Sequence, residues 1–242
     1  MNVEALERAC LEAWPARQRE RHYGWEFCAT DGRSGRANAI WPLAWSGRDL
    51  DDAIEMASDW SVARGIAPTF KLADGATQPT HLAQALADNR FSPETETLVM
   101  TREIGAATAA LSVELHEHAR EDIWSPLRES APNEADAAER RDIVERITAQ
   151  RRFALVRLDG KPAAVGLGVL TGGAVGLYLM RTAPWARRRG FARDIVNALM
   201  DWGASSGARS AYLQVERANQ AAIGLYANEG FELQYQYRYW RR

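Results

Sequence analysis

The stretch RTAPWARRRGFARDI, residues 181–195, holds residue types that could bind a phosphate, because five arginines lie between an apolar run and a helical pattern. The first turn of a helix presents free backbone N–H groups and the positive end of the helix dipole, which attract anions. Gly190 would let a phosphate approach the backbone without an intervening Cβ, and Ala192 keeps the first turn slim. Positive charge at the mouth comes from Arg187, Arg188 and Arg193. We therefore expect a pyrophosphate at this turn, although these residues alone also fit a solvated basic helix start.

A second block, QVERANQAAIGLYANEGF, covers residues 214–231 and contains three positions that could serve a ligand or only the fold. Asn219 fits a helix N-cap, Tyr226 fits an amphipathic core aromatic, and Gly230 fits a helix C-cap. Each structural interpretation is good when taken singly.

Taken together, the two blocks resemble the signatures of the GNAT superfamily of N-acetyltransferases. Arg-x-x-Gly-x-Ala preceded by Thr-x-Pro, residues 182–192, resembles its coenzyme A pyrophosphate loop. Asn219 after a strand, Leu225-Tyr226 near a helix end and Gly230-Phe231 opening the last strand resemble its other signature. The resemblance covers about residues 111–242, and it implies acetyl-CoA as co-substrate and a small-molecule or peptide amine as acceptor.

The resemblance also implies roles for individual residues. The strand before the loop would carry a bulge, so that the backbone of Met180, Arg181 and Thr182 contacts pantetheine and supplies the oxyanion donor. Tyr226 would protonate the leaving thiolate, since a phenol with a pKa of about 10 stays protonated at neutral pH. The cofactor-binding set is Met180, Arg181, Thr182, Arg187, Arg188, Arg189, Gly190, Phe191, Ala192, Arg193, Asn219 and Tyr226.

The general base is where the sequence departs from many relatives, because the strand AVGLYLMRT, residues 174–182, contains no carboxylate. Glu216 at the end of the next strand could replace it, or a water chain could carry the proton. By strand alternation Tyr178 should face the same side as Met180 and line the acceptor site. Trp124 stands where it could line a pocket or be buried.

Two classes of function remain open on these residues. The first is a catalytic N-acetyltransferase in which the amine attacks acetyl-CoA directly in a ternary complex. The second is a non-catalytic acetyl-CoA-binding sensor, which the missing strand carboxylate keeps open. Tyr226 together with the intact loop favours catalysis.

Hydrophobic periodicity predicts the elements that must position these residues. Strand segments are expected at 24–30, 36–43, 67–73, 94–103, 111–115, 152–158, 162–170, 174–182, 210–216 and 231–240. Helices are expected at 3–13, 50–65, 80–90, 120–129, 133–150, 189–207 and 219–230. Tight turns such as Asp159-Gly160 make the three strands before the loop an antiparallel meander. The fold class is α/β (α+β), with a mixed, mostly antiparallel sheet flanked by helices.

An internal repeat divides the chain in two. A shift of 142 residues places 53–72 on 195–214, with Asp59-Trp60 falling on Asp201-Trp202. The first copy lacks the loop residues, since Trp45, Arg48 and Leu50 stand where the second copy has Arg187, Gly190 and Ala192. We therefore expect tandem GNAT-like folds, with a degenerate domain at 1–106 and a catalytic domain at 107–242, separated near 104–110. The first domain could cover the acceptor cleft, mimic a dimer partner or act as a scaffold.

Composition narrows the function classes further. A net charge of -2 argues against general nucleic-acid binding, and no apolar run reaches the roughly 20 residues needed to span a bilayer. Cys10 and Cys28 are expected to be reduced thiols, and the four dispersed histidines suggest no metal site. We therefore expect a cytoplasmic, metal-free monomer or homodimer.

Overall fold

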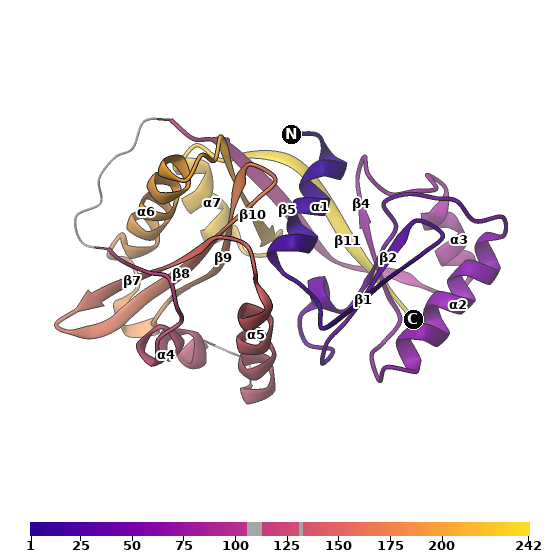
Figure 1. Ribbon diagram of the computed structural model, residues 1–242, viewed down its shortest axis with the longest axis horizontal. Helices are drawn as coiled ribbons and strands as arrows, with labels where there is room; N and C mark the ends of the chain where they lie inside the picture. Colours follow the sequence, from indigo (N-terminus) through magenta and orange to yellow (C-terminus); the bar gives the residue numbers. More distant parts are fainter. Residues whose placement is uncertain (106–112, 131–132) are drawn as a thin grey trace.

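The computed structural model describes residues 1–105, 113–130 and 133–242, which form a mixed α/β fold (Figure 1). The strands are β1 Gln18–His22, β2 Trp25–Ala29, β3 Ile40–Trp41, β4 Thr69–Ala73, β5 Ser92–Glu103, β6 Glu114–His116, β7 Arg151–Leu158, β8 Lys161–Thr171, β9 Ala174–Thr182, β10 Ser210–Glu216 and β11 Glu232–Arg241. The helices are α1 Val3–Ala13, α2 Leu50–Val62, α3 Leu82–Asp88, α4 Glu121–Ser130, α5 Glu134–Arg146, α6 Phe191–Ser205 and α7 Gln220–Asn228, with 3-10 turns η1 Gly35–Ala37 and η2 Pro184–Ala186.

All of these strands join one sheet in the order β1-β2-β3-β4-β11-β5-β10-β9-β8-β7-β6. Most neighbours are antiparallel, and the parallel pairs are β3–β4 and β9–β10. The meander β7–β8–β9 is antiparallel, as the turn residues predicted. The predicted mixed, mostly antiparallel sheet flanked by helices is therefore confirmed.

Polar caps start several helices where the sequence pattern placed them. The side chain of Asn2 accepts from the Ala5 N–H at the start of α1, and that of Asn133 accepts from the Asp136 N–H at the start of α5. Each carboxamide satisfies one of the free N–H groups of a first helical turn. The predicted helix at 3–13 is confirmed residue for residue.

Two predicted segments differ markedly from the structure, and one strand was not predicted. The strand expected at 36–43 is a 3-10 turn followed by the two-residue strand β3, and the hairpin partner of β2 on its other side, β1, was not predicted. The helix expected at 133–150 ends at Arg146, because Ile147 takes an extended conformation. Part of the strand expected at 111–115 and most of the boundary expected at 104–110 lie outside the described residues.

The helices cover two faces of the second half of the sheet, and β7 shows how they are separated. Phe153 and Leu155 belong to the core cluster that includes α1, α4 and α5. Ala154 and Val156 alternate with them and belong to the cluster that includes α6 and α7. Because side chains alternate along a strand, the face of α1, α4 and α5 is opposite the face of α6 and α7 (Figure 1).

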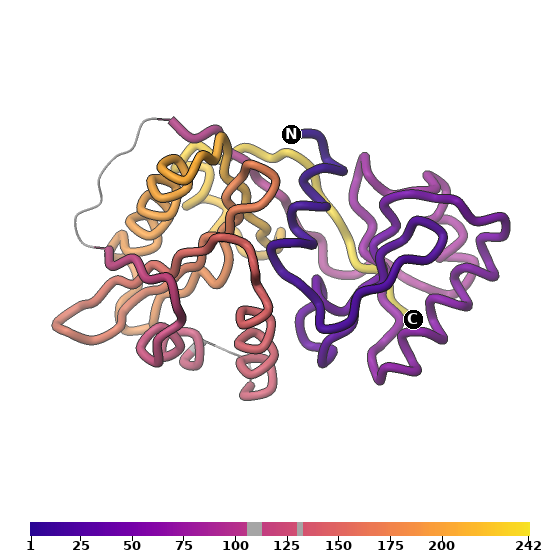
Figure 2. Tube along the Cα trace, viewed as in Figure 1, coloured from indigo at the N-terminus to yellow at the C-terminus, as the bar shows by residue number. Residues whose placement is uncertain are grey.

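The two halves of the chain repeat one arrangement and exchange their last strands. Each half contains a parallel strand pair, a helix, and then a further helix and strand, as the internal repeat predicted. However, β11 pairs with β4 of the first half, while β5 pairs with β10 of the second half. Figure 2 shows the yellow C-terminal strand running into the indigo and purple first half. The division at 1–106 and 107–242 stays a prediction, and the spatial halves share these two strands.

A buried ion pair lies where the halves meet. Lys71 of β4 and Glu7 of α1 are both fully buried and form a salt bridge. Tyr235 of β11 donates its hydroxyl proton to the same carboxylate. Burial raises the pKa of Tyr235 far above its ordinary value, with a further contribution from the Glu7 charge. The cluster joins the N-terminal helix to strands from both halves of the chain.

Candidate active site

The strands β9 and β10 separate before either of them ends. Their parallel pairing runs only from Ala174–Ser210 to Leu177–Leu213, although β9 continues to Thr182 and β10 to Glu216. A cleft of about 760 Å³ lies between the separated segments. Its lining consists of Arg36, Arg140, Leu177, Tyr178, Leu179, Met180, Arg181, Thr182, Arg187, Leu213, Gln214, Val215, Glu216, Asn219, Ala221, Ala222, Leu225 and Tyr226.

A β-bulge in β9 leaves backbone groups available in this cleft. Leu179 has a φ of 51°, and the register with β8 passes from Tyr178–Leu167 to Arg181–Val165. Leu179 and Met180 consequently have no register partner on either β8 or β10 within the described sheet. The bulge that the family resemblance implied is therefore confirmed, and it leaves the backbone next to Met180 free to contact a ligand.

The bulge also corrects the predicted orientation of Tyr178. Met180 packs with the cluster on the α6 face, and Tyr178 belongs to the cluster on the α1 face. The prediction that the two side chains share one side is wrong, because the bulge inserts an extra residue and reverses the alternation. Tyr178 stacks on Trp14 with ring centroids 5.3 Å apart and an interplanar angle of 5°.

The predicted phosphate loop connects β9 to α6 and ends at a left-handed N-cap. Gly190 has a φ of 85°, a conformation that L side chains rarely adopt. A Cβ built on it would meet no atom within 4 Å, so the backbone is open to an approaching group. Within the described residues, the N–H groups of Phe191 and Ala192 donate no hydrogen bond, and the first bonds of the turn are donated by Arg193 and Asp194 to the Gly190 carbonyl.

The arginines of the loop are placed differently from one another. Arg187 lines the cleft, and Arg193 forms a salt bridge with Glu229 at 3.0 Å, which links α6 to the end of α7. Arg189 lines a separate hollow beside Trp185, and Arg188 is exposed with a φ of 64°. Phe191 packs against the small cluster of Ala163, Ala183 and Ala186.

Tyr226 of α7 lines the cleft with a hydroxyl that forms no hydrogen bond to any described residue. Its ring packs against Phe231 with centroids 6.1 Å apart. Burial raises the pKa of Tyr226 to about 12, and the positive charge of Arg181 opposes this shift. The phenol is therefore protonated at neutral pH and can donate its proton to a group in the cleft.

Asn219 and Glu216 lie at the other wall of the cleft, where β10 ends. The Asn219 side chain accepts from the Ala222 N–H at 3.2 Å, so it is the N-cap of α7 as well as part of the lining. Glu216 is exposed, and its side chain forms no ion pair among the described residues. The structure thus brings Met180, Arg181, Thr182, Arg187, Glu216, Asn219 and Tyr226 to one cleft. It leaves Arg188, Arg189, Gly190, Phe191, Ala192 and Arg193 outside the lining, where the loop continues into α6.

Several lining residues were not found from the sequence. Tyr178, which the sequence predicted, lines the cleft, and its hydroxyl lies 2.9 Å from that of Tyr212, a residue outside the lining that the sequence did not mark. Burial raises the pKa of both phenols well above the ordinary value. Gln214 accepts from the Tyr237 hydroxyl at 3.0 Å. Arg36 comes from η1 of the first half. No local pattern marks these side chains, because only the long-range strand pairing brings them together.

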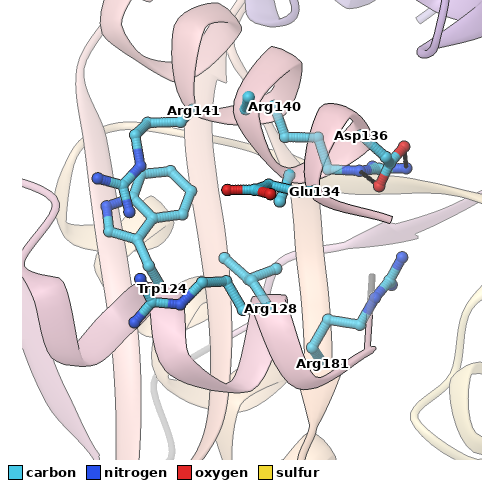
Figure 3. Close-up of a pocket in the computed structure, with 10 residues that line it drawn as sticks. Trp124, Arg128, Glu134, Asp136, Arg140, Arg141 and Arg181 are labelled. Atoms are coloured by element: carbon cyan, nitrogen blue, oxygen red, sulfur yellow. Dashed lines mark hydrogen bonds and ion pairs between the residues drawn. The ribbon is translucent and has the colours of Figure 1, made fainter. Parts of the chain in front are cut away.

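A smaller pocket of about 220 Å³ adjoins the cleft and shares Arg140 and Arg181 with it. It lies between α4 and α5, and Figure 3 shows Trp124 and Arg141 at one end and Arg181 at the other. The guanidinium of Arg141 lies over the Trp124 ring, 4.8 Å from its centroid. Trp124 is 6% exposed, so it is buried and lines a pocket at the same time.

The remaining titratable and apolar groups form no further site of a kind that binds a metal ion or crosses a membrane, within the residues that the structure describes. Among the described residues, no group of three or more His, Cys, Asp or Glu side chains is placed to hold a metal ion. Within the same residues, no helix is both long and apolar enough to span a bilayer. Cys10 and Cys28 are buried and not bonded to each other, and burial raises the pKa of both thiols to about 12.

Known proteins resemble this chain along nearly its whole length. The family model described as "Probable histone acetyltransferase Rv0428c C-terminal" matches residues 1–240. The uncharacterized N-acetyltransferase YobR of Bacillus subtilis is 27% identical over 95% of this chain and 94% of its own. The probable histone acetyltransferase Rv0428c of Mycobacterium tuberculosis is 28% identical over 98% of this chain and 73% of its own.

Solved structures share the fold across both halves. A GCN5-related N-acetyltransferase from Kribbella flavida has a TM-score of 0.74 at 16% identity, covering 100% of this chain and 96% of its own. A tandem GNAT protein from the clavulanic acid biosynthesis pathway has a TM-score of 0.64 at 12% identity, and the match covers 98% of this chain and 87% of that protein's chain. The tandem arrangement predicted from the internal repeat therefore has a solved counterpart.

Proposed function

The chain belongs to the GNAT N-acetyltransferase family described by the C-terminal region of the probable histone acetyltransferase Rv0428c, and from this membership we propose that it transfers the acetyl group of acetyl-CoA to an amine. The observation that best supports this is the bulged, separated strand β9 with the unbonded Tyr226 hydroxyl beside it. The fold and the relatives' names support an N-acetyltransferase in general. The amine, from a small molecule or a peptide, is part of the proposal.

The residues present fit coenzyme A. The open backbone at Gly190 and the free N–H groups of Phe191 and Ala192 suit a diphosphate, and Arg187 adds charge where the loop meets the cleft. The backbone of Leu179 and Met180, which has no partner in the sheet, suits the amide groups of pantetheine. When bound, acetyl-CoA supplies an activated thioester carbonyl.

This chain's own residues then divide the work of the transfer. The backbone beside Met180 would hold the carbonyl oxygen as charge develops on it. The amine nitrogen forms a bond to the carbonyl carbon, and the carbon–sulfur bond breaks. Glu216, directly or through water, would take the proton that the amine loses, and Tyr226 would give its proton to the departing sulfur. The products are the N-acetylated acceptor and free coenzyme A.

The test is thiol release with a panel of primary amines, together with calorimetric titration of acetyl-CoA. We expect acetyl-CoA to bind one site per chain and at least one amine to raise thiol release above hydrolysis. Glu216→Gln should lower the rate at neutral pH if the carboxylate takes the proton, whereas Glu232→Gln on exposed β11 should not. Tight binding without turnover across the panel would contradict catalysis and favour an acetyl-CoA sensor.

A further inference from the structure

The cleft carries an excess of positive charge on its acceptor side. It crosses the sheet, since Tyr226 belongs to the cluster on the α6 face and Tyr178 to the cluster on the α1 face. The phosphate loop lies at the start of α6, so a thioester extending from it leaves the other face for the amine. Arg36, Arg140 and Arg181 border that other side, while Glu216 is the carboxylate that the cleft lining contains.

Arg36 is a guanidinium without a counter-charge. Its Cζ lies 5.3 Å from the Trp14 ring centroid and 5.2 Å from that of Tyr178. Across the described parts of the chain, its side chain forms neither an ion pair nor a hydrogen bond. The two rings stabilise the positive charge through cation–π contacts, but they supply no acceptor for the five N–H donors of the guanidinium.

The loop that presents Arg36 is held from the second half by a buried carboxylate. Glu139 of α5 is 1% exposed and accepts from the Asp31 N–H at 2.7 Å, the Arg33 N–H at 3.2 Å and the Asn38 Nδ2 at 2.9 Å. The Ser34 N–H also donates to it. Four donors on one carboxylate fix the loop to α5, so the position of Arg36 over the cleft is defined rather than incidental.

Arg181 and Arg140 lie where the cleft joins the smaller pocket, and they differ in how they are paired. Arg140 donates two hydrogen bonds to Asp136, at 2.7 and 3.0 Å. Arg181 donates only to the neighbouring Met180 carbonyl at 2.9 Å and forms no ion pair with a described residue. Two guanidiniums without carboxylate partners, Arg36 and Arg181, therefore lie on the acceptor side.

The smaller pocket offers an apolar wall beside these charges. Trp124, Leu127, Ala137 and Ala138 contribute to its lining. A molecule that places its amine at the thioester and its anionic group between the arginines could lay its organic body against Trp124 (Figure 3). Guanidinium groups bind carboxylates and phosphates with paired, charge-assisted hydrogen bonds.

We propose that the acceptor is an amine whose molecule also carries an anionic group, a carboxylate or a phosphate, held by Arg36 and Arg181. The proposal rests on the proposed function, because it assigns the substrate class of the same cleft. It makes a strongly cationic peptide a poor acceptor, since three arginines would repel it.

The test uses acceptors in matched pairs, in which one member carries an anionic group that the other lacks. Leucine is compared with leucinamide, phosphoethanolamine with ethanolamine, and a lysine-rich peptide serves as the cationic acceptor. We expect kcat/KM to be at least about tenfold higher for the member of each pair that carries the anionic group. This ratio corresponds to the contribution of about one charge-assisted hydrogen bond. The leucine and phosphoethanolamine pairs separate carboxylate from phosphate recognition. A preference for neutral members or for the lysine peptide would overturn the proposal while leaving acetyl transfer intact.

Variants tie the preference to the named side chains. Arg181→Gln and Arg36→Gln should each reduce the preference for the anionic acceptor at least threefold. Arg36→Gln should do so with acetyl-CoA affinity unchanged, and Arg36→Lys should retain part of the preference. Arg33→Gln is the matched control, because Arg33 lies in the same loop, is exposed and lies outside the cleft lining. An undiminished preference in both glutamine variants would also overturn the proposal.

A binding experiment covers acceptors that are turned over slowly. The protein saturated with coenzyme A is titrated with N-acetylleucine and with N-acetylleucinamide, and the change in tryptophan fluorescence, to which Trp14 and Trp124 contribute, reports occupancy. We expect the carboxylate to bind more tightly than the amide, and Arg181→Gln to remove the difference. Equal affinities in the wild-type protein, or no binding of either, would count against anion recognition, whereas failure to bind acetyl-CoA at all would count against the proposed function.

Discussion

The helix N-termini that follow the parallel strands β3 and β9 differ in what meets their free N–H groups. At α2, the Asp49 carboxylate accepts from the N–H groups of Asp51 and Asp52, and both of those residues add negative charge to the first turn. At α6, Gly190 has no side chain to accept from the turn, and arginines precede it. The first half therefore carries its own anion at this position, and the second half leaves the position to a ligand.

The strands β3 and β9, which precede these helices, also differ in how far their backbone groups are hydrogen-bonded. The pair β3–β4 has one parallel partner, Ile40–Phe70, and beyond it the Gln78 N–H donates to the Pro42 carbonyl at 2.7 Å. In β9, a bulge leaves Leu179 and Met180 without partners. The first half thus bonds its own backbone just after its strand, whereas the second half leaves backbone without a sheet partner within its strand.

The largest expected effect comes from filling the open N-terminus. Gly190→Glu should weaken acetyl-CoA binding about 1000-fold, because it combines a strained positive φ with a carboxylate in the place of the diphosphate. Isothermal titration calorimetry measures the loss. Arg48→Glu, at the related position of the first half, should leave the affinity unchanged. Loss of binding from Arg48→Glu alone would contradict a single site in the second half.

The next effect concerns the acid that the second half has and the first half lacks. A shift of 140 residues aligns the last helix of each half and places Leu86, which is fully buried, at the position of Tyr226. Tyr226→Phe should lower kcat about 100-fold with acetyl-CoA affinity unchanged. Because the pKa of Tyr226 is raised to about 12, the phenol stays protonated in the wild-type protein up to about pH 10. The wild-type kcat should therefore show no alkaline decrease from this group below that pH, and an unchanged kcat in the variant would exclude Tyr226 as the acid.

A smaller effect tests whether the first half shapes the cleft. Glu139→Gln should lower the free energy of unfolding by about 2 kcal/mol, because the amide leaves part of its set of buried N–H donors unsatisfied. It should also raise the acceptor KM, since the loop carrying Arg36 loosens, with the acetyl-CoA affinity unchanged. Urea unfolding and initial rates measure the two. Glu145→Gln, exposed on the same helix, is the control. An unchanged KM would limit the first half to a scaffold.

The smallest expected effect comes from removing the Asp49 carboxylate, which caps α2 in the first half. Asp49→Ala should lower the free energy of unfolding by about 1 kcal/mol, the usual value of an N-cap. The stoichiometry of acetyl-CoA should remain one per chain, because the first half lacks the glycine and the bulge as well. Thermal unfolding and calorimetry measure these results, and a second binding event in the variant would mean that the two halves differ only by this cap.

Much of this molecule follows from local patterns. The helix at 3–13, the meander before the loop and the position of Gly190 were predicted because caps, turn dipeptides and periodicity are encoded within a few residues. The orientation of Tyr178 was predicted wrongly, because one inserted residue at Leu179 reverses the alternation and no residue type marks a bulge.

The contribution of the first half to the site depends on distant contacts. Arg36 reaches the cleft only because its loop donates to Glu139, which is more than a hundred residues further along the chain. A comparison of the two repeats cannot predict the exchange of β5 and β11 either. The sequence of each strand would also suit pairing within its own half. Sequence periodicity predicts which face of a strand is buried, and it does not choose among several compatible neighbours.

The strand exchange has a consequence for how the protein folds and for what can be cut from it. The pairing of Glu232 with Thr101 joins residues 131 positions apart, so the centre of the sheet closes only after most of the chain is available, which favours slow folding. The exchange of β5 and β11 occurs within one chain, whereas a domain-swapped dimer exchanges such elements between two chains. A fragment limited to the second half would leave β10, one wall of the cleft, with an unpaired edge where β5 is now bonded. The first half, which lacks the phosphate loop, therefore supplies through β5 the strand that pairs with β10, one wall of the cleft in the second half.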